Sequence, residues 1–131
     1  MIFHDIERVV RQIDELCNAV LHHPGMMANR ERLFSELGTH TMSLSDQVLT
    51  LQIAPLVGLA SQIMAQADIV KRRIAHSWAR APDDPNAASA IDCAARDLLG
   101  DLSVLRDRLA HAQLCEEVSW SAPFTNHRPA P

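Results

Sequence analysis

The clearest candidate for metal chemistry in this sequence is a strip of three residues near the C-terminus. Asp107, His111 and Cys115 recur every four residues, so on a helix they would project from one side, and two of them could share a metal ion. The strip also adjoins an apolar seam, where a histidine and a cysteine often simply pack. Metal sites in helical bundles usually draw Glu-x-x-His pairs from facing helices, and the sequence contains no such pair. We therefore favour packing over metal binding and expect no cofactor.

His76 is the candidate for phosphoryl transfer. An exposed histidine on a four-helix bundle is the nucleophile of histidine phosphotransfer domains, which carry a small residue and a lysine soon after it. Here Trp78 and Arg80 occupy that region, and Pro82 ends the helix. A partly exposed histidine near a helix C-terminus, where the helix dipole favours positive charge, accounts for the same pattern. We favour this second interpretation.

Basic residues are densest around the same histidine. A stabilising role at the end of a helix needs no ligand, because cations oppose the negative end of the helix dipole. The alternative is an acidic protein partner or a phosphate, since the chain is acidic overall. The cluster consists of Lys71, Arg72, Arg73, His76 and Arg80.

Motifs of common enzyme classes are missing. There is no Gly-x-Ser-x-Gly elbow, and only four glycines are present, none in a phosphate-binding loop. The net charge is −4 and the isoelectric point is near 5.9, whereas a duplex-binding domain usually carries a basic surplus. We therefore expect neither catalysis nor a nucleic-acid partner.

Cysteine usage and the N-terminus predict a cytoplasmic protein. Cys17, Cys93 and Cys115 are far apart and form no C-x-x-C pair, which is typical of reduced thiols. No signal peptide or membrane-spanning run is visible. Eleven of the twelve cationic residues are arginine, a bias typical of GC-rich bacterial genomes.

The elements that position these residues are predicted by an apolar residue every three or four positions in three stretches. This is the period that an α-helix needs to keep one seam against neighbouring helices. A composition with only five aromatic residues also favours helix over sheet. The seams are Ile2, Ile6, Val9, Ile13, Leu16 and Val20; Leu49, Ile53, Leu56, Ala60, Ile63, Ala67, Val70 and Ile74; and Ile91, Ala95, Leu98, Leu102, Leu105, Leu109 and Ala112.

Helix-breaking residues set the expected boundaries in the first half of the chain. The first helix is predicted over residues 3–22, because Pro24 disfavours helix in the residue before it. Pro24 can begin a short second helix that ends near Gly38. The polar residues 39–43 predict a loop.

A long third helix is predicted from Ser43 or Ser45 to Arg80. Pro55 and Gly58 lie inside it, but the apolar period keeps its phase, so we expect a kink. Residues 81–86 form the next break, with Asp84 as cap and Pro85 as first residue of a fourth helix to about residue 118. Residues 121–131 contain three prolines and no period, which predicts a flexible tail.

Apolar residues outside these seams are the best clue to function. Two long helices that are apolar on more than one face expose more apolar surface than two short helices can bury. The fold can wrap these faces internally, or a second copy or another protein can cover them. The surplus residues are Leu99, Val104, Leu114 and Val118 on the fourth helix, and Leu44, Val48, Leu51, Val57, Leu59, Met64 and Ile69 on the third.

The sequence thus predicts an all-α, single-domain bundle over residues 1–120, with two long antiparallel helices and two shorter N-terminal ones. We expect a non-catalytic protein–protein interaction module, such as a small bacterial regulator, adaptor, chaperone or immunity-type binder, working as a homodimer or with a protein partner. A signalling or metal-responsive bundle that uses His76 or the His111/Cys115 pair is the alternative. The expected binding residues are Leu99, Val104, Leu114, Val118 and Trp120.

Overall fold

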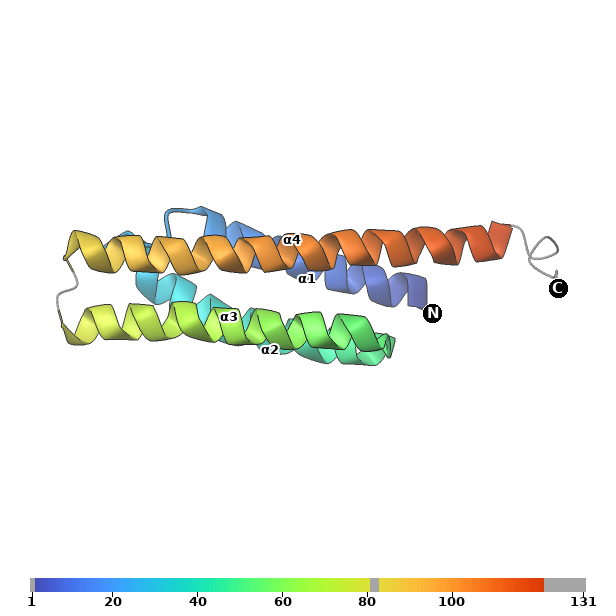
Figure 1. Ribbon diagram of the computed structural model, residues 1–131, viewed down its shortest axis with the longest axis horizontal. Coiled ribbons are helices and arrows are strands. Elements are labelled where there is room, and N and C mark those ends of the chain that lie inside the picture. The colour runs from blue at the N-terminus through green and yellow to red at the C-terminus, as the bar shows by residue number, and fades with distance from the viewer. Residues whose placement is uncertain (1, 81–82, 122–131) are drawn as a thin grey trace.

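The protein is a bundle of four α-helices (Figure 1). The computed structural model describes residues 2–80 and 83–121, with side-chain surroundings for residues 4–80 and 83–112. The main contacts join α1 to α2, α2 to α3, α3 to α4 and α4 back to α1, so consecutive antiparallel helices enclose one core. The predicted all-α four-helix bundle is confirmed. The helices are α1 (Ile2–Leu21), α2 (Met27–Leu51), α3 (Ala54–Ala79) and α4 (Pro85–Ser121).

The apolar seams of α1, α3 and α4 form most of the core. On α4 every seam residue from Ile91 to Leu109 is buried, and on α3 the same holds from Leu56 to Ile74. On α1 the buried seam runs from Ile6 to Val20. Within the described residues, no helix is long and apolar enough to span a membrane.

The predicted loop over residues 39–43 is wrong, because α2 continues through it to Leu51. Thr41 is buried in the α2 seam, and its hydroxyl donates to the carbonyl of Leu37 in the same helix. This bond satisfies the buried hydroxyl, so a polar residue does not interrupt the helix. Leu44, Val48 and Leu51, predicted as apolar surplus of the third helix, instead form the core face of α2.

The predicted kink at Pro55 is a complete break. Gln52 adopts a left-handed conformation with φ of 57° and ends α2, and Ile53 precedes the first residue of α3. Pro55 is then the second residue of α3, where its missing N–H costs no helical hydrogen bond. The segment predicted as one long helix is therefore two, and α4 is the longest helix with 37 residues.

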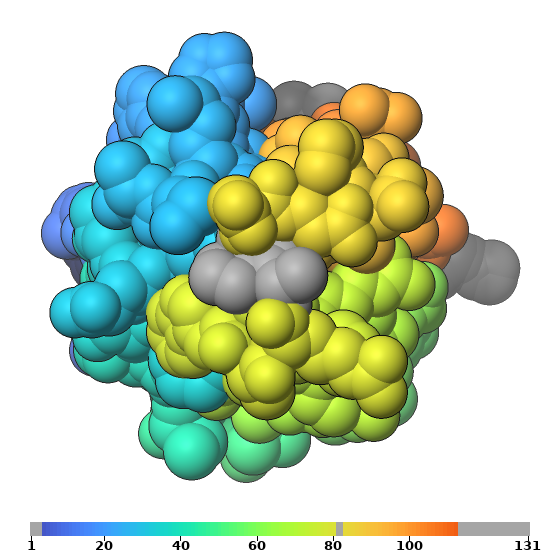
Figure 2. All heavy atoms as spheres, turned by 90° about the vertical axis from the view of Figure 1, so that its left-hand side faces the viewer, coloured from blue at the N-terminus to red at the C-terminus, as the bar shows by residue number. Residues whose placement is uncertain are grey.

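The turn after α1 is held by contacts from two other helices. Gly25 is buried between α2 and α4, and its amide donates to Asp92 Oδ1 at 2.7 Å. Its carbonyl accepts from Arg30 Nε at 2.8 Å and Nη2 at 2.6 Å. The view along the bundle shows residues in the twenties lying beside the start of α4 (Figure 2). After this turn α2 begins at Met27, with Met26 in an extended conformation, and not at the predicted Pro24.

The start of α4 agrees with the prediction. Pro85 is its first residue, and Asp84 Oδ1 accepts the amide of Asn86 at 3.0 Å. The Asp84 carbonyl accepts the amides of Ala87 and Ala88. The predicted Asp84 cap is confirmed. The predicted tail lies outside the described residues from position 122 onward.

Replacing Gly58 by alanine is expected to stabilise the protein. Gly58 is exposed in α3, and a Cβ added there meets no atom within 4 Å. Because alanine loses less backbone entropy on folding, the free energy of unfolding should rise by about 0.5–1 kcal/mol. Urea unfolding of Gly58→Ala measures this change. A loss of stability would show that the start of α3 needs the freedom of glycine.

Candidate binding surfaces on α3 and α4

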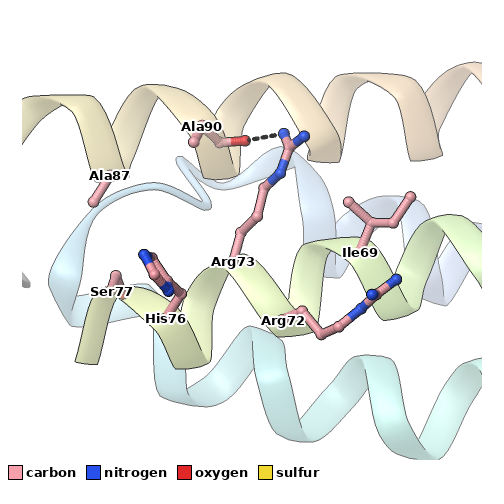
Figure 3. Close-up of a pocket in the computed structure, with 7 residues that line it drawn as sticks. All are labelled: Ile69, Arg72, Arg73, His76, Ser77, Ala87 and Ala90. Atoms are coloured by element: carbon pink, nitrogen blue, oxygen red, sulfur yellow. Dashed lines mark hydrogen bonds between the residues drawn. The ribbon is translucent and has the colours of Figure 1, made fainter. Parts of the chain in front are cut away.

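A groove lies between the end of α3 and the start of α4 (Figure 3). Its volume is about 560 Å³, within the range of ligand-binding sites. The groove exists because α4 presents only the small side chains of Ala87 and Ala90 at this level, which leave space between the helices. The lining residues are Ile69, Arg72, Arg73, His76, Ser77, Ala87 and Ala90.

The rim of the groove is cationic and its floor is apolar. Arg73 reaches across to α4, where Nη1 donates to the Ala90 carbonyl at 2.8 Å (Figure 3). Arg72 Nε pairs with Asp68 Oδ2 at 3.0 Å on the same helix. Each guanidinium has five N–H donors, so both keep donors for an anionic ligand. Ile69, Ala87 and Ala90 are half-buried and offer apolar contact below them.

The basic cluster predicted from the sequence is divided in space. Arg72, Arg73 and His76 line the groove, whereas Lys71 lies over the ring of Phe34, with Nζ 5.2 Å from its centroid. The Phe34 ring also lies 5.4 Å from that of Trp78. This aromatic contact between α2 and α3 could not be predicted from the sequence, because Phe34 and Trp78 are distant along the chain.

His76 is exposed at the edge of the groove, as expected of a histidine near a helix C-terminus (Figure 3). The hydroxyl of its neighbour Ser77 is engaged within the fold. Ser77 Oγ donates to the Ile74 carbonyl at 2.6 Å and accepts from Arg30 Nη1 at 3.1 Å. The buried guanidinium of Arg30 thus ties the end of α3 to the turn at Gly25.

The predicted metal strip is only partly described. Asp107 and His111 are exposed on α4, whereas the side chain of Cys115 lies outside the described part. Among the side chains that the structure describes, no three His, Cys, Asp or Glu residues are placed to hold a metal ion.

The described cysteines are free thiols in different surroundings. Cys93 is exposed and Cys17 is half-buried. Burial raises the pKa of the Cys17 thiol, and the negative charge of Asp14 raises it further. Cys17 therefore stays protonated at neutral pH and packs as a small hydrophobe. On α4, burial and the neighbouring Asp97 raise the pKa of Asp101.

The predicted binding residues differ in their surroundings. Leu99 is half-buried and packs against the core, whereas Val104 is 41% exposed. Leu114, Val118 and Trp120 belong to the last turns of α4, and their side chains lie outside the described part. This end of α4 extends past the other three helices (Figure 1).

The apolar residues of α3 that were predicted to lie outside the seam are partly buried within the bundle. There are four of them, and all four are half-buried. These are Val57, Leu59, Met64 and Ile69. Leu49, predicted as the first residue of the second seam, is instead 52% exposed, because it belongs to α2 and not to the helix that carries the rest of that seam. Other large apolar side chains are exposed as well. They are Leu21, Met26, Met27, Met42 and Trp78.

Comparisons with protein-family models, with curated proteins and with solved structures found no match for this chain.

Proposed function

We propose that this protein is a non-catalytic protein–protein interaction module of the bacterial cytoplasm, of the kind that small regulators, adaptors, chaperones or immunity-type binders use. The observation that carries the proposal is the length of α4. Its last turns extend past the ends of α1, α2 and α3 (Figure 1), so no helix of the described bundle lies alongside them.

The sequence of these last turns supports binding to another protein surface. Leu114 and Val118 lie one helical turn apart, and Trp120 follows. Aromatic and aliphatic residues supply most of the free energy of protein interfaces when a partner removes them from water. The core does not need this segment, since the α4 seam is already buried up to Leu109.

The test is to replace Leu114 and Val118 by serine. If these side chains form the contact, each should contribute on the order of 1 kcal/mol or more to binding. Light scattering should then show a shift toward monomer, or an affinity-purified complex should lose its partner, with unchanged helicity by circular dichroism.

The matched control replaces two exposed apolar residues of α2, Met42 and Leu49, by serine. They are 59% and 52% exposed, so the loss of apolar surface is similar but lies away from α4. This variant should bind like the parent. A parent protein that stays monomeric at high concentration and captures no partner contradicts the proposed function.

A further inference from the structure

We propose that the outward face of α4 binds a second copy of this chain, with the two α4 helices antiparallel around a two-fold axis near Ser103. The inference rests on the proposed function and names its partner. Ser103 is the middle residue of the 37 in α4, so this arrangement overlaps the two helices along their whole length.

The charges of α4 are self-complementary about this midpoint. Arg96 and Asp97 precede Ser103, and Asp107 and Arg108 follow it. All four side chains are exposed, and none forms an ion pair with another described residue. Exposed charges that have no ion partner among the described residues are available to a second copy.

An antiparallel pairing places opposite charges together. Arg96 of each copy faces Asp107 of the other, and Asp97 faces Arg108. The centre of each pair lies within two residues of Ser103. A two-fold axis repeats both contacts, which gives four ion pairs across one interface. A parallel pairing in register would instead place Arg96 against Arg96 and Asp107 against Asp107, and the repulsion disfavours it.

The helical period places these residues on the face that the core does not use. Positions 96 and 107 are three turns apart and fall on one stripe. Positions 97, 104 and 108 are separated by seven and four residues and fall on a neighbouring stripe, with the exposed Val104 between the two charges. The core positions Leu98, Leu102 and Leu105 lie on the opposite side and are buried.

In the same arrangement, the end of α4 that extends past the bundle lies beside the second copy. With the axis near Ser103, the last turns of each copy lie along the first turns of α4 in the other. Along the sequence, positions 114 and 118 continue the stripe of positions 96 and 107.

A charge-swap experiment tests the pairing. Arg96→Asp and Asp107→Arg each convert two attractive contacts per dimer into repulsive ones. Each single variant should raise the dimer dissociation constant by roughly tenfold or more. The double variant R96D/D107R restores opposite charges and should return the constant close to that of the parent. Sedimentation equilibrium measures it, and thermal unfolding shows that each variant is folded.

The control reverses two exposed charges on α1, in the variant R8E/R11E, which should leave the dimer intact. Parent dimers that dissociate more readily as salt is raised would further support the ion pairs. A monomeric parent overturns the inference, as does a dimer that neither single variant weakens or that the double variant fails to restore. If the parent is monomeric but captures another protein through Leu114 and Val118, only this inference fails and the proposed function stands.

Discussion

Replacing Leu102 by aspartate is expected to unfold the protein at ordinary temperatures. Leu102 is fully buried in the centre of the core, between seam residues of the neighbouring helices. A carboxylate at this position loses its water without gaining a partner, and the leucine side chain no longer fills its space. The combined cost is several kcal/mol, comparable with the whole stability of a domain of this size.

Circular dichroism and urea unfolding measure the loss, and Ala110→Asp is the matched control. Ala110 lies on the same helix but is exposed, so aspartate there keeps its water and should change the free energy of unfolding by less than about 0.5 kcal/mol. If Leu102→Asp melted like the parent, the assignment of the α4 core face would be wrong.

Replacing Gly25 by alanine is expected to destabilise the protein by about 2–4 kcal/mol, a large effect for one methyl group. An added Cβ would lie 2.5 Å from the carbonyl oxygen of Ala88 and 2.7 Å from Asp92 Oδ1. The turn must then move away from α4, which weakens the bond from the Gly25 amide to Asp92. The Arg30 guanidinium, which donates to the Gly25 carbonyl, must move as well.

Gly38→Ala is the control for this substitution, with thermal unfolding as the measurement. The nearest atom to a Cβ at Gly38 is Lys71 Nζ at 3.6 Å, an ordinary contact, and Gly38 lies within α2. This variant should therefore be as stable as the parent or more stable. Equal melting temperatures for the parent and Gly25→Ala would show that the turn after α1 is not locked by Asp92 and Arg30.

The candidate surfaces were only partly predictable. The basic residues Arg72, Arg73 and His76 stood out in the sequence, but the groove they border depends on Ala87 and Ala90, which another helix supplies. Two alanines in a helix give no indication in the sequence that a groove lies beside them. The exposure of Val104 agrees with its position outside the seam, whereas Leu99, which lies closer to the seam around the helix, is half-buried against the core.

Sequence alone is enough to predict the helical class, the core faces of α1, α3 and α4, and the turns at Pro24 and Asp84. These features depend on local physics, namely the period of apolar residues and the backbone limits of proline. The full extent of α2 and its complete separation from α3 depend on how the four helices pack. The polar residues at 39–43 stay helical because Thr41 bonds within the helix while the α2 seam packs on α1 and α3. Pro55 marks this point in the sequence as a kink or a break, because it cannot bond to the Leu51 carbonyl. The residue that ends α2 in the left-handed conformation is Gln52, a type that does not favour this conformation, so the local sequence does not choose between the two outcomes.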